Sequence, residues 1–169
     1  MDSVDRPALV ATVREAGPLD ILVANAGITV FGDPLATDPG AVDAMFDVNV
    51  RALWHAFVEA ARTMPDGGRL IAIGSANADR VPTPGGAAYA LTKSALSGMV
   101  RGLARDFGGR GITVNAVQPG PVASLLHGFM AISRHVRTDE VAAMVAWLAS
   151  AEAAMVTGTT QTIDGGFTA

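Results

Sequence analysis

Short aliphatic runs alternate along the chain with longer segments in which apolar residues recur every three or four positions. The short runs predict strands at residues 20–23, 69–73, 112–117 and 159–163. The longer segments predict helices at residues 7–15, 39–64 and 86–107, and a fourth helix that begins at Thr138 as its N-cap. Strands and helices therefore alternate from one end of the chain to the other.

This alternation predicts an α/β fold in which parallel strands are joined by right-handed crossovers, with helices on both faces of an open sheet. No repeat or linker divides residues 1–169, so a single domain is expected. Gly and Pro gather at 27–40, 82–86, 119–121 and 164–166. Most of these segments follow a predicted strand, which is where open α/β sheets bind their ligands.

Composition narrows the class of protein. Half of the residues are apolar but only 5% are aromatic, so small aliphatic side chains must build the core. The net charge is −4 and the basic residues are scattered, which argues against a nucleic acid polymer as partner. The acidic start, the absence of Cys and the interruption of the apolar tract 141–156 by Ser150 and Glu152 favour a cytoplasmic protein without a membrane span.

The histidines and tryptophans are predicted to have structural roles and not to bind ligands. His55, His127 and His135 lack the spacing of a metal site or a catalytic triad and are expected at the surface or in packing. Trp54 and Trp147 lie in apolar helical stripes and are predicted to be core or helix-interface residues.

Three residues suggest proton-transfer chemistry. Tyr89 and Lys93 lie four positions apart in a predicted helix and share one face, and Ser75 follows a predicted strand. A phenol ordinarily titrates at about pH 10, and a nearby ammonium favours the phenolate, so Lys93 is expected to lower the pKa of Tyr89. Tyr89 could then exchange a proton with a carbonyl or alcohol whose oxygen is hydrogen-bonded by Ser75.

The order of several motifs resembles the short-chain dehydrogenase/reductase family over nearly the whole chain. These are Asn25-Ala26-Gly27, Asp47-Val48-Asn49-Val50, Ser75, Tyr89 with Lys93, Pro119-Gly120 and Ile163-Asp164-Gly165-Gly166. The resemblance implies a partial Rossmann fold, a doubly wound parallel sheet that lacks the first three strands and the glycine-rich loop. It implies an oxidoreductase that acts on a small carbonyl or secondary alcohol substrate, with Ser75, Tyr89, Lys93 and Asn49 as catalytic residues. Asn49 would anchor a proton-relay water through the helix backbone.

The cofactor implied by this resemblance is NADP or NAD. Its expected contacts are Asp2, Asn25, Ala26, Gly27, Tyr89, Lys93, Pro119, Gly120 and Val122. Asn25 fits equally well as a strand-end residue that satisfies backbone groups. The choice between NADP and NAD cannot be read, because the residues that set it belong to a strand that the sequence lacks.

The sequence departs from the family pattern in two places. The loop Thr-Gly-x-x-x-Gly-x-Gly, whose amides hold the pyrophosphate, is missing. Without the strands that accompany it, the strand at 20–23 is expected to be an exposed edge that invites pairing or aggregation. After Pro121 the substrate loop is expected to be shortened, and Ala123 stands where a Thr often contacts the cofactor.

Three hypotheses remain open. The first is an NAD(P)-dependent reductase that assembles as a homodimer or homotetramer through the helices 39–64 and 86–107. The second is a regulatory module of biofilm dispersal that binds a nucleotide such as cyclic-di-GMP, a ligand suggested by family resemblance in 59–65, 67–70 and 98–112. Arg101 and Arg105 are spaced like a guanine-binding pair, or they lie on a solvated helix face. The third is a truncated product that folds poorly.

Overall fold

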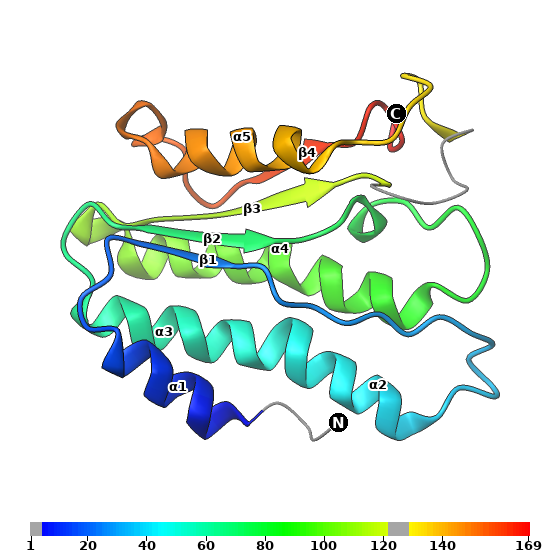
Figure 1. Ribbon diagram of the computed structural model, residues 1–169, viewed down its shortest axis with the longest axis horizontal. Helices are drawn as coiled ribbons and strands as arrows, with labels where there is room; N and C mark the ends of the chain where they lie inside the picture. Colours follow the sequence, from blue (N-terminus) through cyan, green and yellow to red (C-terminus); the bar gives the residue numbers. More distant parts are fainter. Residues whose placement is uncertain (1–4, 122–128) are drawn as a thin grey trace.

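The predicted parallel sheet is present. The structure, a computed structural model, describes residues 5–121 and 129–169. Its strands are β1 (Ile21–Ala24), β2 (Arg69–Ile73), β3 (Thr113–Pro119) and β4 (Thr160–Ile163). They pair in parallel in the order β1-β2-β3-β4 (Figure 1). All four strand predictions are confirmed.

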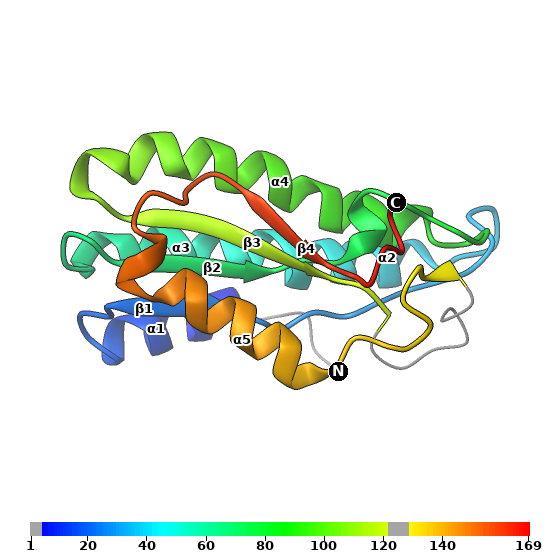
Figure 2. The same cartoon turned by 90° about the horizontal axis from the view of Figure 1, so that it is seen from above.

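Helices cover both faces of the sheet. They are α1 (Arg6–Glu15), α2 (Pro39–Phe46), α3 (Leu53–Thr63), α4 (Ala87–Phe107) and α5 (Thr138–Ala149). Short 3-10 turns lie at Ala76–Ala78, Gly108–Arg110 and Ala151–Ala153. Figure 1 shows α5 on one side of the sheet and α1, α3 and α4 on the other, which is the doubly wound arrangement expected. Figure 2 shows α5 and α4 from above, separated by β3 and β4.

The predicted helix 39–64 is not a uniform α-helix. A π-helical segment, Asp47–Ala52, separates α2 from α3. A π turn accommodates an extra residue, and the period of apolar positions does not reveal it. Asn49 lies buried in this segment, and π turns are frequent at functional sites.

The larger core lies between the sheet and the helices α1, α3 and α4. The buried stripe of α3 consists of Leu53, Ala56, Phe57, Ala60 and Ala61. Its three- and four-residue spacing turns one helix face to β1 and β2. A second cluster beneath α5 contains Ile71, Val117, Leu148 and Ala153. Because β2 contributes Leu70 to the first cluster and Ile71 to the second, it is covered on both faces.

Neither tryptophan belongs to this core. Trp54 is 44% exposed, one position away from the buried stripe of α3. Trp147 is also exposed, one position before the buried Leu148. The prediction that the tryptophans lie in the core is therefore wrong, because each lies one helical position away from the buried face. Their alternative role, at an interface between helices, stays a prediction.

Among the residues that the structure describes, β1 lies at one end of the strand order, as predicted. Ile21 and Val23 are exposed, whereas Leu22 and Ala24 point to the opposite face and pack against the larger core. Since α5 lies over β2 and β3, it leaves the outer side chains of β1 uncovered.

The last helix differs in detail from its prediction. The N-cap is Arg137, with Thr138 as the first helical residue, because Glu140 folds back and accepts a hydrogen bond from the Arg137 amide at 2.9 Å. The tract 141–156 is α-helical only as far as Ala149 and continues with the 3-10 turn Ala151–Ala153. Of the residues in α5 only Leu148 is fully buried. Within the two described ranges, no helix is both long and apolar enough to cross a membrane.

Candidate active site

Ser75, Tyr89 and Lys93 meet beyond the carboxyl end of β2. Ser75 has an extended backbone and caps the turn Ala76–Ala78, where its hydroxyl accepts a hydrogen bond from the Asn77 amide at 3.1 Å. Tyr89 and Lys93 project from the first two turns of α4. The Tyr89 phenol lies close enough to the Ser75 side chain for Ser75 to lower its pKa. The strand end and the helix therefore bring together the three side chains expected from the sequence.

The electrostatics of Tyr89 differ from expectation. Burial raises the pKa of Tyr89 above its ordinary value, and the nearby Ser75 side chain offsets only part of this rise. The Lys93 ammonium lies 5.8 Å from the centre of the phenol ring. The expected lowering of the Tyr89 pKa by Lys93 is wrong for this structure, because burial dominates.

Lys93 is nearly enclosed. It is only 5% exposed, and its Nζ atom donates a hydrogen bond to the Ile73 carbonyl at 3.0 Å, at the end of β2. Burial lowers the pKa of Lys93. A Cβ atom at Gly27 would lie 3.4 Å from this ammonium and 3.3 Å from the Asn49 Oδ1 atom. The absence of a side chain in the Asn-Ala-Gly motif thus leaves room for both groups.

Asn49 holds the chain that follows β1. It is 1% exposed; its Oδ1 atom accepts from the Ile28 amide at 2.9 Å, and its Nδ2 atom donates to the Ile28 carbonyl at 2.8 Å. The same Nδ2 atom donates to the Thr92 hydroxyl at 3.1 Å. Its side chain is thus engaged with protein groups, so any part in a proton relay must involve the backbone of the π-helical segment. That relay stays a prediction.

Thr92 is a site residue that the sequence reasoning missed. It is fully buried, and its hydroxyl donates to the Tyr89 carbonyl at 2.8 Å while accepting from Asn49. A hydrogen-bonded path therefore runs from Ile28 through Asn49 and Thr92 to Tyr89. The available signal was a threonine three positions after the tyrosine, a spacing at which the hydroxyl can reach a backbone carbonyl of its own helix.

A cavity of about 230 Å³ opens beside these groups. It is lined by Asn25, Gly27, Ile28, Thr29, Ile73, Gly74, Tyr89 and Lys93. An ammonium, a phenol and a glycine-bordered wall suit the ribose and nicotinamide end of a dinucleotide. The described residues thus fit that end of the cofactor.

The remaining predicted cofactor residues are in different places. Ala26 lies in the lining of a separate groove of about 300 Å³ between β1 and the helices α1 and α3. A Cβ at Gly120 would lie 2.6 Å from the Asp164 Cα, so Pro119-Gly120 packs closely against the C-terminal turn. Asp2, Val122 and Ala123 lie outside the described residues.

The Asp164 carboxylate organises that C-terminal turn. It accepts hydrogen bonds from the Gly166 amide at 2.8 Å and from the Thr168 hydroxyl at 2.7 Å. Burial raises the pKa of Asp164, but these hydrogen bonds outweigh it and the net pKa is lowered. The C-terminal motif thus has a structural role here, in fixing the chain beside Gly120.

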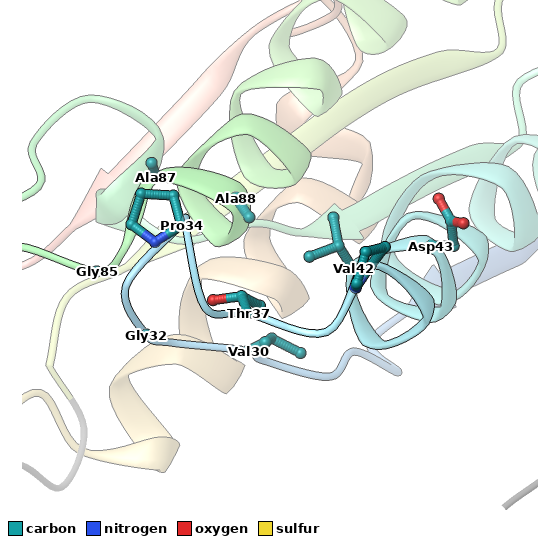
Figure 3. Close-up of a pocket in the computed structure, with 10 residues that line it drawn as sticks. Val30, Gly32, Pro34, Thr37, Val42, Asp43, Gly85, Ala87 and Ala88 are labelled. Carbon is teal, nitrogen blue, oxygen red and sulfur yellow. The ribbon is translucent and has the colours of Figure 1, made fainter.

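A second cavity, of about 340 Å³, lies beside the loop that follows β1 (Figure 3). Its lining includes Val30, Gly32 and Pro34 from the loop and Ala87 and Ala88 from the start of α4. Phe31 does not line it: its ring centroid lies 5.6 Å from that of Tyr89. The loop after β1 therefore contributes residues to both cavities.

Known proteins match this chain over almost its full length. Residues 2–168 match the family model described as enoyl-(acyl carrier protein) reductase. The chain is 56% identical to the cyclic-di-GMP-binding biofilm dispersal mediator protein of Escherichia coli (strain K12), over 98% of this chain and 75% of that protein. The crystal structure of BdcA in complex with NADPH has a TM-score of 0.96 and 56% identity, over 100% of this chain and 74% of that one. A short chain dehydrogenase from Burkholderia cenocepacia J2315 in complex with NADP has a TM-score of 0.95 and 43% identity, over 99% of this chain and 75% of that one.

The parallel sheet and the group at its carboxyl edge define an α/β oxidoreductase that uses a nicotinamide cofactor. The chain belongs to the short-chain dehydrogenase/reductase family. Two of these solved relatives are complexes with NADPH or NADP. The resemblance stated from the motifs is confirmed.

Proposed function

We propose that the chain reduces a small carbonyl substrate, or oxidises the matching secondary alcohol, with Tyr89 as the proton donor and acceptor. The observation that carries this proposal is the approach of Ser75 to the Tyr89 phenol, with Tyr89 and the buried Lys93 lining one cavity. A phenol and a hydroxyl side by side can both donate hydrogen bonds to one carbonyl oxygen.

When bound, NADPH supplies the hydride that adds to the carbonyl carbon. Tyr89 gives its phenolic proton to the carbonyl oxygen, the carbonyl π bond breaks, and an alcohol and a tyrosinate remain until the tyrosine is reprotonated. Ser75 donates a hydrogen bond to the developing oxyanion. The raised pKa of Tyr89 keeps the phenol protonated at neutral pH, which suits the reductive direction.

The other predicted residues support this chemistry. Lys93 would hold the ribose hydroxyls of the cofactor and stabilise the tyrosinate after proton transfer. Asn25 and Gly27 would contact the ribose and nicotinamide, since both line the cavity with Tyr89. Asn49 would position the loop at Ile28 and, through its backbone, a relay water.

Titration of the purified chain with NADPH and NADH by calorimetry, followed by turnover with a panel of ketones and aldehydes, tests this proposal. Tyr89→Phe should leave NADPH affinity within a few fold and lower kcat by about 10²–10⁴-fold, the usual contribution of a positioned acid. Ser94→Ala is a matched control, because the Ser94 hydroxyl on the same helix bonds to the Ala78 carbonyl instead. Undiminished turnover by Tyr89→Phe would refute the proposed role, and a folded chain that binds no NADPH would refute cofactor use.

A second candidate function is binding of cyclic-di-GMP, favoured by the name of the 56% identical relative. Arg101 and Arg105 lie exposed one turn apart on α4 and would contact a guanine of the ligand. Calorimetric titration with cyclic-di-GMP should then give saturable binding that Arg101→Ala with Arg105→Ala abolishes. Equal binding by the wild type and this double variant would exclude the arginine pair.

Assembly as a homodimer or homotetramer through the helices 39–64 and 86–107 is also proposed, in the cytoplasm. Exposed apolar side chains on both helices support it, among them Trp54 on α3 and Leu91 on α4. Light scattering coupled to gel filtration should show two or four chains, and Leu91→Arg should reduce that number. A wild-type monomer would contradict the proposal.

A further inference from the structure

The environment of Tyr89 includes an aromatic residue that the catalytic roles above do not use. Phe31, in the loop after β1, has its ring centroid 5.6 Å from that of Tyr89, with 40° between the ring planes. Tilted aromatic pairs at this separation attract one another. Phe31 is nevertheless 53% exposed, so that one side of its ring faces Tyr89 while much of the rest faces solvent.

Close backbone contacts hold Phe31 in this place. The Gly32 amide donates a hydrogen bond to the Gly85 carbonyl at 3.1 Å, which ties the loop to the segment before α4. Gly85 has a φ of +89°, and a Cβ there would lie 3.2 Å from the Gly32 backbone, so glycine suits this crossing on both counts. Figure 3 shows Gly32 and Gly85 beside each other at the start of α4.

The adjoining Gly86 gives the ring its space. A Cβ at Gly86 would lie 3.0 Å from the Phe31 Cε1 atom and 2.9 Å from the Val81 Cγ1 atom. The Phe31 ring therefore rests directly on Gly86, the N-cap of α4, three residues before Tyr89. Along the loop, Val30 and Gly32 line the second cavity, and Phe31 between them contacts the tyrosine.

We propose that Phe31 is a positioning residue for Tyr89: its ring covers the phenol on the solvent side and keeps it protonated and directed to Ser75. This inference rests on the proposed function for its catalytic meaning, but the shielding itself can be measured without cofactor or substrate. Burial is the larger cause of the raised pKa of Tyr89, and the Phe31 ring lies within 5.6 Å of the phenol ring, close enough to exclude water from it.

The charged neighbours of Tyr89 set the direction of the test. In the part of the chain that the structure describes, the ammonium that faces the phenol is Lys93, 5.8 Å from the ring centre. Asp33, the acid nearest to Phe31 in the loop, is engaged by the Leu35 amide at 2.9 Å. Removing the Phe31 ring admits water to the phenol and leaves Lys93 in place. Hydration of the phenol favours the tyrosinate, so the pKa of Tyr89 should fall toward its ordinary value.

Tyr89 is the only tyrosine of the sequence, so its ionisation can be followed directly by absorbance at the tyrosinate band or by the NMR resonance of its Cζ carbon. Phe31→Ala should lower the titration midpoint of the folded protein relative to the wild type. Leu35→Ala is the matched control, since Leu35 lies in the same loop and is 95% exposed; its midpoint should equal that of the wild type. Circular dichroism at each pH confirms that the fold persists.

Gly86→Ala provides a second route to the same result. Gly86 has a φ of −91°, which any residue can adopt. The methyl group of alanine would displace the Phe31 ring without removing it. A lowered midpoint in both Phe31→Ala and Gly86→Ala supports the inference. An unchanged midpoint in Phe31→Ala, or an equal fall in Leu35→Ala, overturns it; if Phe31→Ala does not fold, Gly86→Ala decides.

Activity separates this inference from the proposed function. If the chain reduces carbonyls, Phe31→Ala should lose kcat/KM at a lower pH than the wild type on the alkaline side, where the phenol loses its proton. A chain that shows the midpoint shift but no turnover would keep the shielding role and refute the reductase proposal. Turnover with an unchanged alkaline limb would refute the shielding role alone.

Discussion

Replacing Thr92 with Val tests the hydrogen-bonded path that joins the π-helical segment to the tyrosine. Val has nearly the shape of Thr but no hydroxyl, so the Asn49 Nδ2 atom loses its acceptor at 3.1 Å and the Tyr89 carbonyl loses a donor at 2.8 Å. Both Thr92 and Asn49 are almost fully buried, and water cannot easily replace the lost partner. The Tyr89 carbonyl keeps its place in the helix, so the main loss is one buried N–H group.

A buried donor left without a partner costs about 1–3 kcal/mol. We therefore expect Thr92→Val to lower the free energy of unfolding by about that amount, with an unchanged dependence on denaturant concentration. Thr92→Ser keeps the hydroxyl and loses one methyl group, which costs about 0.8 kcal/mol. Urea unfolding followed by circular dichroism measures both.

The result depends on Asn49, and a double-mutant cycle isolates that dependence. In an Asn49→Ala background the unpaired donor no longer exists, so Thr92→Val should cost less than in the wild type. The difference between the two backgrounds should be about 0.5–3 kcal/mol, as for other residues in direct contact. An identical cost in both backgrounds would refute the idea that Thr92 acts through Asn49.

Three further predictions concern the rest of the fold. Hydrogen bonds from Arg134 and the Arg137 amide lower the pKa of Glu140 to about 2. Glu140 should therefore stabilise the fold above the ordinary glutamate pKa of 4.5 and lose this effect as the pH falls through about 2. The Tm difference between the wild type and Glu140→Gln should shrink over that window, and a constant difference would contradict this prediction. Gly120→Ala places a Cβ 2.6 Å from the Asp164 Cα and should lower the free energy of unfolding by about 1–3 kcal/mol. Gly98, inside α4, has no neighbour within 4 Å of such a Cβ, so Gly98→Ala should raise the free energy of unfolding by about 0.5–1 kcal/mol. Urea unfolding that reverses this order would contradict the packing described. Val23→Lys on the exposed β1 edge should reduce self-association in sedimentation velocity, and an unchanged sedimentation profile would argue against edge pairing.

Much of the fold follows from the sequence because the strands are compact aliphatic runs. The run at β2 is buried on both faces, so its side chains are uniformly apolar after Arg69 and its limits were predicted without error. The apolar spacing of α3 likewise predicts that one face of this helix is buried, but it does not show which residues lie on that face. Trp54 and Leu53 are adjacent in the sequence, and only packing against the sheet determines which of the two is buried.

The π-helical segment shows where local pattern stops being informative. Its extra residue is accommodated where Asn49 reaches across to Ile28, a contact between segments 21 residues apart in the chain. Neither helix propensity nor apolar periodicity contains that long-range contact. The Arg137 cap was missed for a related reason, because the Glu140 carboxylate satisfies the Arg137 amide and makes the Thr138 hydroxyl unnecessary as a cap.

In the candidate site, the sequence predicted which residues come together but not the environment that sets their pKa values. Motif order placed Ser75, Tyr89 and Lys93 together correctly, since the ends of parallel strands and the helices after them meet at one edge. The pKa of Tyr89 is raised and not lowered as expected. The sequence does not show how deeply the phenol is buried, or that the Lys93 ammonium donates a hydrogen bond to the Ile73 carbonyl.

The contacts that hold the catalytic group are separate from those expected to hold the cofactor's pyrophosphate. Ser75 contacts the Tyr89 phenol, Thr92 binds the Tyr89 carbonyl, Ile73 binds Lys93, and Ile28 binds Asn49. These partners lie in the described strands and helices or in the segments that directly follow β1 and β2. None of these bonds requires a glycine-rich cradle, so the geometry of the proton donor and the affinity for NADP(H) can fail independently. Measurement of the Tyr89 ionisation therefore reports on the first property, calorimetry with NADPH reports on the second, and only turnover requires both.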